Sequence, residues 1–229
     1  MAVAPGPARL GDRWPLASIH EPARWLGIDL GVCRAAGGRW LRPVGNPAPP
    51  VIGIAVAAVG VAVVPYSKTW PLLFEQESLR LHAALAPWLV GSVEHIGSTA
   101  VLGLASKPIL DMLAPVADLR VARAAVPVLA DLGYRHAEHR PREALWFYEQ
   151  QGEDYDTRTH QVHLTRTDSA LWRERVTFRD ALCGDATLLA EYQALMQTLA
   201  ASDADLTVYT GGKREFVERV LRSEGLTLG

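Results

Sequence analysis

The residues with the clearest chemical potential lie in one stretch of the chain, from Val93 to Leu113. Within it, Gly97, Ser98 and Thr99 follow a short apolar segment. A Gly-Ser pair at a strand end lets backbone N–H groups approach a phosphate closely, and the two hydroxyls can donate hydrogen bonds to its oxygens. The same tripeptide is ordinary turn chemistry. It predicts an anion cradle only in combination with other residues.

The carboxylate Asp111 interrupts a short apolar run downstream of this turn. Because side chains alternate along a strand, Ile109, Asp111 and Leu113 are expected on one face, with Leu110 and Met112 on the other. A carboxylate in so apolar a strand is costly to bury unless it is paired, hydrogen-bonded or bound to a metal. Turn N–H groups, an arginine and a metal ion are all possible partners.

Lysine is rare in this chain, with Lys68, Lys107 and Lys213 standing against 20 arginines. Lys107 directly precedes Pro108, which favours an extended backbone before the apolar run. Its ammonium group could meet a phosphate or Asp111, or it could be a solvated surface lysine.

Two histidines, His160 and His163, lie in an expected strand near residues 161–165. Strand alternation places them on opposite sides unless His160 precedes the strand, so a two-histidine metal site is not expected. His163 could ligate a metal, donate to a phosphate or act as an acid or base near neutral pH. It could equally be a core histidine that is hydrogen-bonded to the backbone.

The C-terminal helical patterns add several charged side chains. Arg179 and Asp180 follow Phe178 on an amphipathic helix, where an arginine–carboxylate pair commonly fixes packing. Alternatively, Arg179 and Lys213 could close a cationic pocket over a phosphate bound at residues 97–99. Arg175 lies on the same helix without an assigned role.

These residues need a scaffold, and the patterning from about residue 61 predicts strands that alternate with helices and a helical C-terminal part. We therefore expect an α/β or α+β domain. Thr69 and Asp118 are candidate N-caps, and Pro127 implies a kink or an early stop in its helix. Strands are expected at 61–66, 93–96, 109–113, 146–149 and 161–165, and helices at about 70–88, 119–133, 168–183, 186–201 and 212–224.

Composition sets broad limits on the function. The chain has 229 residues, 49% of them hydrophobic, which is enough to bury a core in one domain with an appendage. A formal net charge of −2 lacks the basic excess of a general nucleic-acid binder. Cys33 and Cys183 form neither a CxxC pair nor a disulfide framework, so a reducing cytoplasmic location is expected.

The N-terminal quarter of the chain differs in amino-acid composition from the rest. Residues 1–60 are rich in Pro, Gly and Arg and are expected to be a poorly ordered extension of a domain spanning residues 61–229. The uncharged run at residues 51–64 is shorter than the roughly 20 residues of a membrane span. Prolines close both of its ends, so a strand or buried linker is favoured over a membrane anchor.

Several separate motifs resemble those of the GrpB family, uncharacterised proteins that are placed in the nucleotidyltransferase superfamily. The resemblance covers about residues 61–222. It is carried by HIGSTAV at 95–101, GLA at 103–105 and KPILD at 107–111, and further by Gly133-Tyr134, RTH at 158–160, VHL at 162–164, FRD at 178–180, Tyr192, Tyr209 and Lys213.

The resemblance implies a small mixed β-sheet of nucleotidyltransferase type, flanked by helices. In that superfamily a Gly-Ser turn precedes a strand with two alternate carboxylates, which hold divalent metal near a nucleoside triphosphate. Asp111 matches the first carboxylate, but Leu113 occupies the second position. Glu149 is the only candidate for a third, and the resemblance favours His163, and then His95, as site-facing.

The leading hypothesis is therefore a nucleotidyltransferase that binds a nucleotide or phosphorylated small molecule with Mg²⁺ or Mn²⁺. Asp111 would ligate the metal, Ser98 and Thr99 would contact phosphate, and Lys107 would stabilise charge. The alternative is a non-catalytic nucleotide- or phosphate-binding or interaction module whose metal site is degenerate, as Leu113 suggests. The acceptor substrate is not indicated.

Overall fold

The computed structural model describes residues 33–34, 40–41, 63–150, 158–201 and 211–227, all within one unit that spans Gly31–Gly229. The expected extension at residues 1–60 and most of the apolar run at 51–64 lie outside the described residues, apart from the two-residue strands β1 (Cys33–Arg34) and β2 (Trp40–Leu41). Among the described residues, no helix is long and apolar enough to cross a membrane.

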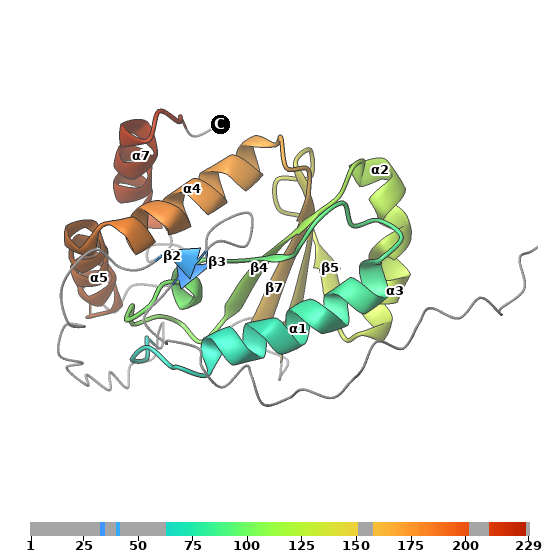
Figure 1. Cartoon of the computed structure of the whole chain (residues 1–229), viewed down its shortest axis with the longest axis horizontal. Helices are drawn as coiled ribbons and strands as arrows, with labels where there is room; N and C mark the ends of the chain where they lie inside the picture. Colours follow the sequence, from blue (N-terminus) through green and yellow to red (C-terminus); the bar gives the residue numbers. More distant parts are fainter. Residues whose placement is uncertain (1–32, 35–39, 42–62, 151–157, 202–210, 228–229) are drawn as a thin grey trace, which may run out of the picture. The chain divides into compact units, whose positions relative to one another are not determined.

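A five-stranded mixed sheet forms the centre of the domain (Figure 1). The strands run in the order β3-β4-β7-β6-β5, and only the central β4–β7 pair is parallel. This arrangement confirms the expected α/β (α+β) class with a small mixed sheet. The strands are β3 (Glu94–Ile96), β4 (Leu110–Pro115), β5 (Arg135–Ala137), β6 (Ala144–Gln150) and β7 (Arg158–Thr165).

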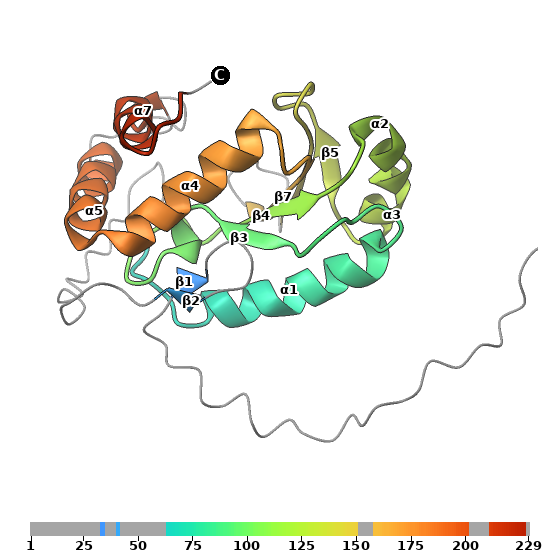
Figure 2. The same ribbon diagram turned by 45° about the horizontal axis from the view of Figure 1, so that its top comes forward.

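Helices cover both faces of this sheet, as Figures 1 and 2 show for α1 and α4 on opposite sides. On one side pack α1 (Trp70–Leu85), α2 (Leu119–Ala122) and α3 (Val126–Asp131). On the other side α4 (Ala170–Gly184) places Val176 against Leu113 and Ile96. The helical C-terminal part continues with α5 (Ala186–Ala201) and α7 (Arg214–Ser223).

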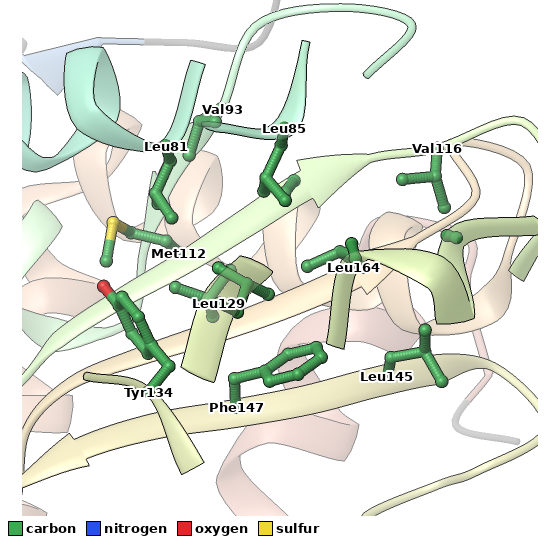
Figure 3. Close-up of a cluster of buried hydrophobic side chains, with 14 of the residues drawn as sticks. Leu81, Leu85, Val93, Met112, Val116, Leu129, Tyr134, Leu145, Phe147 and Leu164 are labelled. Carbon is green, nitrogen blue, oxygen red and sulfur yellow. The ribbon is translucent and has the colours of Figure 1, made fainter. Parts of the chain in front are cut away.

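The main core lies between the sheet and α1, α2 and α3 (Figure 3). Alternation along β4 points Leu110 and Met112 into this core, while Asp111 and Leu113 face α4, as the sequence predicts. Burying each large apolar side chain contributes about 1.5–3 kcal/mol, so the α1 face supplies most of the stability. The opposite face of the sheet, which faces α4, carries polar residues such as Asp111.

The sequence signals for the ends of helices were right at some positions and wrong at others. The Asp118 carboxylate accepts a hydrogen bond from the Arg120 backbone N–H at 2.7 Å and caps α2 as expected. Thr69 precedes α1 but makes no capping hydrogen bond, because its hydroxyl is paired with that of Ser67 at 2.7 Å. Pro127 lies in the first turn of α3, so the expected single helix is divided there.

Two strand predictions need correction. Of the strand expected at 61–66, the structure describes residues 63–66, and they form only an isolated bridge, between Val64 and Ser106. The edge strand β5 was not predicted. Its residues Arg135 and His136 are exposed, so it lacks the apolar alternation that marks a strand in a sequence.

Candidate functional site

The turn after β3 requires a glycine. Gly97 has φ of 71° and ψ of −173°, a conformation that L-residues rarely adopt. A Cβ atom at this position would lie 2.4 Å from Oδ2 of Asp111. The carboxylate therefore lies directly against the glycine backbone, and the 3₁₀ turn Ser98–Ala100 begins beside it.

Asp111 is held at this place by strand pairing on both sides. It lies opposite Ile96 of β3 and opposite Gln161 of β7. The side chain is half-buried, and burial raises the pKa of the carboxyl group from 3.8 to about 6. The positive charges of Arg175, Lys213 and Arg158 oppose this rise. The carboxylate is thus mostly ionised at neutral pH, at a cost in stability.

Cationic side chains from separate segments lie close enough to this carboxylate to lower its pKa. Lys213, the residue before α7, is half-buried, and burial lowers the pKa of its ammonium group to about 8. The charge of Asp111 acts against that shift, whereas Lys107 and Arg175 add to it. Arg158 begins β7 and is buried, while Arg175 on α4 is exposed. Positive charge therefore exceeds negative charge around Asp111.

Thr99 faces the protein interior, whereas Ser98 is half-buried. The Thr99 hydroxyl donates a hydrogen bond to the Ile109 carbonyl at 3.0 Å and lies 3.1 Å from Nε2 of His95. A hydroxyl has a single proton, and that of Thr99 is used in the hydrogen bond to Ile109. This bond connects the turn to the start of β4. A direct contact of Thr99 with phosphate stays a prediction.

Arg179 fixes the strand that leads into the turn. Its side chain is 2% exposed, and its Nη1 donates to Oε2 of Glu94 at 2.9 Å and to the His95 carbonyl at 2.8 Å. Its Nε donates to Oδ1 of Asp180 at 2.7 Å. This is the packing role that the sequence leaves open as one alternative, and a contact of Arg179 with phosphate stays a prediction.

His163 shares a sheet face with Asp111, as the family resemblance implies. It lies opposite Leu113 on β4 and Trp146 on β6. Burial, and then the charge of Arg175, hold its pKa well below 6.5, so the imidazole is neutral at pH 7. Its Nδ1 is buried without a hydrogen-bond partner among the described residues. A catalytic role for His163 stays a prediction.

Glu149 cannot share a metal ion with Asp111, because the two carboxylates lie on opposite sides of the sheet. Glu149 is paired in register with His160, and its Oε2 lies 3.6 Å from Nδ1 of that histidine and 3.8 Å from Nη1 of Arg80. The expectation that His160 and His163 face opposite sides is confirmed. The suggestion of Glu149 as a third carboxylate was wrong.

The donor set around Asp111 does not fit a two-metal centre. Leu113 is fully buried against Ile96 and Val176, so no carboxylate occupies the alternate strand position. Within the described residues, no group of three or more His, Cys, Asp or Glu side chains could hold a metal ion. Asp111 does fit one Mg²⁺ or Mn²⁺ that is held mainly by phosphate oxygens of a ligand, because Mg²⁺ commonly uses one or two carboxylates in this way.

Two of the cations were missed as site residues. Arg175 lies one helical turn before Arg179, and Arg158 lies two residues before His160. In a chain with 20 arginines, neither residue type nor spacing singles them out. The pairing of β7 with β4 brings Arg158 to Asp111, and the packing of α4 against β3 and β4 brings Arg175 there.

Replacing Asp111 with asparagine should raise the melting temperature at pH 7. The folded-state pKa of about 6 exceeds the unfolded value of 3.8, so the stability contributed by this carboxyl group falls as pH rises from about 3.8 to 6. Asparagine resembles the neutral form and removes that loss. Thermal unfolding at pH 4.5 and 7 should show the gain mainly at pH 7. An equal gain at both values, or a decrease at pH 7, would contradict the assignment.

Comparisons with known proteins place this chain in context. The family model described as "GrpB protein" matches residues 60–223. The Glutamate-rich protein GrpB of Alkalihalophilus pseudofirmus is 29% identical over 70% of this chain and 94% of its own length. A UPF0157 protein of Deinococcus radiodurans is 31% identical over 70% of this chain and 80% of its own. A crystal structure of the conserved protein GrpB from Enterococcus faecalis matches with a TM-score of 0.62 at 26% identity, over 72% of this chain and 99% of that one.

Proposed function

This chain belongs to the GrpB family, and we propose that it binds a nucleotide or another phosphorylated ligand at the Gly97 turn, with Asp111 facing the ligand. The observation that carries this proposal is the convergence of Arg158, Arg175 and Lys213 on one carboxylate beside a glycine turn. A phosphate group offers several anionic oxygens to such a cluster, and charge-assisted hydrogen bonds to it are strong.

The residues have distinct parts in binding. Arg175, being exposed, can reach a ligand without rearrangement, whereas the buried Arg158 raises the local positive potential. Lys213 and Lys107 interact with each other electrostatically, so an anion between them would relieve their repulsion. Backbone N–H groups and the Ser98 hydroxyl in the turn would donate to phosphate oxygens. Asp111 would contact a divalent ion bound by the phosphates.

Nucleotidyl transfer is the reaction that the family resemblance implies for this site. It would use Asp111 as the protein ligand of one Mg²⁺ or Mn²⁺, and the metal would neutralise charge on the phosphates. The single carboxylate, with Leu113 buried beside it, favours ligand binding over two-metal catalysis. Binding is therefore the proposal, and transfer is an additional activity to be assayed with the same variants.

Arg175→Ala should weaken binding of a nucleoside triphosphate by roughly tenfold or more, since a hydrogen bond between charged groups contributes about 1.5–3 kcal/mol. Arg173→Ala is the matched control, because Arg173 is an exposed arginine of the same helix. Isothermal titration calorimetry of the full chain with a nucleoside triphosphate, with and without Mg²⁺, measures the affinity.

Asp111→Asn completes this experiment. If Asp111 contacts a ligand-bound metal, the variant should bind at least as tightly as the wild type without Mg²⁺, because a negative charge near the phosphates is removed, but it should lose the Mg²⁺-dependent gain. Equal losses in Arg175→Ala and Arg173→Ala, or no binding of any phosphorylated ligand by the wild type, would refute the proposed function.

A further inference from the structure

A second group of polar side chains lies near the Asp111 site, around His163 on the same face of the sheet. It includes His139, which has no part in the function proposed above. The His139 ring centroid lies 6.1 Å from that of His163 and 5.7 Å from that of Trp146. His139 is exposed, whereas His163 is 6% exposed. His139 is therefore the histidine of this pair that meets solvent.

Arg140 fixes the loop that carries His139. Its φ of 48° is the only positive value at a non-glycine residue within the described ranges. A backbone in this conformation persists only where its surroundings enforce it. The Arg140 guanidinium group donates to Glu174 at 2.6 and 3.3 Å and to Glu143 at 2.8 Å. Glu143 also accepts a hydrogen bond from the backbone N–H of Leu171 at 2.9 Å, which fastens the loop to α4.

The two histidines have hydrogen-bonding capacity that the described part of the chain does not use. Nδ1 of His163 is buried there without a partner, and His139 makes no hydrogen bond to any described residue. Buried polar atoms are nearly always paired in native structures, so an unpaired one indicates a partner such as a bound ligand or a water molecule.

Arg175 connects the two histidines with the Asp111 site. Its charge acts on the Asp111 carboxyl group and on both imidazoles. Burial, and then that charge, hold the pKa of His139 and of His163 below 6.5, so both are mostly neutral at pH 7. Arg175 forms no ion pair or hydrogen bond with the residues that the structure describes. Its guanidinium group is thus available to a ligand, unlike that of Arg140.

One available guanidinium group and two neutral imidazoles match a carboxylate better than a phosphate. A guanidinium group binds a carboxylate through two parallel hydrogen bonds, and imidazole N–H groups can donate to the remaining lone pairs. A phosphate carries up to about two negative charges and is better matched by the several cations near Asp111.

The two places are close enough for one small molecule to occupy both. His163 lies opposite Leu113, two residues beyond Asp111 on β4. With about 3.3 Å per residue along a strand and about 4.8 Å between strands, the backbones at Asp111 and His163 are roughly 8 Å apart. A short carbon chain between two anionic groups spans this separation.

From these contacts we infer that the phosphorylated ligand also carries a carboxylate group, which His139, His163 and Arg175 bind. The inference rests on the proposed phosphate site at the Gly97 turn. Arg140 is a positioning residue, since it holds His139 in place without touching the ligand. The ligand class is then a small phosphorylated carboxylic acid.

The test compares probes that differ in one group. Glycerol 3-phosphate and 3-phosphoglycerate share their carbon chain and phosphate, but only the second has a carboxylate. Isothermal titration calorimetry of the full chain should show 3-phosphoglycerate binding roughly tenfold more tightly, the factor expected for a hydrogen bond between charged groups. Glycerol 1,3-bisphosphate, with a second phosphate in place of the carboxylate, should bind less tightly than 3-phosphoglycerate. The reverse order would overturn the assignment of a carboxylate.

His139→Phe, which keeps a ring but no donor, should remove most of the preference for 3-phosphoglycerate. His136→Phe is the matched control, because His136 is exposed and lies opposite Phe147, whose ring is in the core on the other face of the sheet. Arg140→Lys, which keeps the charge but not the planar fork, should lose part of the preference. All three variants should bind glycerol 3-phosphate as the wild type does.

The outcomes separate the inference from the function on which it rests. Equal binding of glycerol 3-phosphate and 3-phosphoglycerate by the wild type, or the same preference in His139→Phe, overturns the inference while the phosphate site stands. If neither probe binds, the inference fails, and the titration with a nucleoside triphosphate decides the proposed function separately. Should His139→Phe misfold, the imidazole NMR resonances of the wild type decide in its place. 3-Phosphoglycerate must then shift those of His139 and His163 more than glycerol 3-phosphate does, and equal shifts overturn the inference.

Discussion

Gly97→Ala should destabilise the domain by about 3 kcal/mol and disrupt the candidate site at the same time. The backbone at φ of 71° and ψ of −173° costs an L-residue about 1–3 kcal/mol. The added methyl group would lie 2.4 Å from Oδ2 and 3.0 Å from Cβ of Asp111, so the strand or the carboxylate must also shift. Chemical denaturation measures the change in the free energy of unfolding.

Gly103→Ala separates these two contributions. Gly103 has φ of 81°, but a Cβ atom there would have no neighbour within 4 Å. The Gly103→Ala substitution should therefore lower the free energy of unfolding only by the cost of the backbone conformation, about 1–2 kcal/mol. In the background of Asp111→Ala, Gly97→Ala should become less costly, because the nearest contact atom is gone. Equal effects of Gly97→Ala and Gly103→Ala would show that the close approach of Asp111 is not present in solution.

Arg179→Met should cost about 3–5 kcal/mol in the free energy of unfolding. Methionine fills much of the same volume, but the change removes the guanidinium group that lies 2.9 Å from the carboxylate of Glu94, a residue that is 9% exposed. Removing one member of a buried ion pair is far more costly than the net value of the pair, because the remaining charge stays desolvated. The hydrogen bond to the His95 carbonyl is lost as well.

An exposed ion pair provides the control for Arg179. Arg120 lies 3.1 Å from Asp118, and its side chain is 91% exposed, so Arg120→Met should leave the free energy of unfolding almost unchanged. Adding Glu94→Gln to Arg179→Met should recover part of the loss, since the buried carboxylate that has lost the Arg179 guanidinium is then replaced by a neutral amide. A loss below about 1 kcal/mol for Arg179→Met would mean that Glu94 reaches solvent or another cation.

The sequence predicts the alternation of β4 well. The face division of Asp111 and Leu113 from Leu110 and Met112 follows from strand geometry alone, and it holds because one side of the strand must meet the core. The opposite orientations of His160 and His163 follow from the same rule. Predictions of this kind depend only on neighbouring residues, which is why they succeed.

The grouping of cations around Asp111 could not be predicted in the same way. Arg158 and Arg175 come from β7 and α4, and they meet Asp111 only through the parallel pairing of β4 with β7 and the packing of α4. The sequence also does not distinguish Thr99, whose hydroxyl donates a hydrogen bond to the Ile109 carbonyl, from its neighbour Ser98. Such distinctions depend on tertiary contacts between distant segments.

The shortness of the two outermost strands has a consequence for solubility. β3 and β5 are three residues each, whereas the inner strands β6 and β7 have seven and eight. An outermost strand has unpaired backbone N–H and C=O groups with which a second polypeptide can pair. A short outermost strand with charged side chains such as Arg135 has few such groups. The longer inner strands are thereby shielded from edge-to-edge aggregation between molecules.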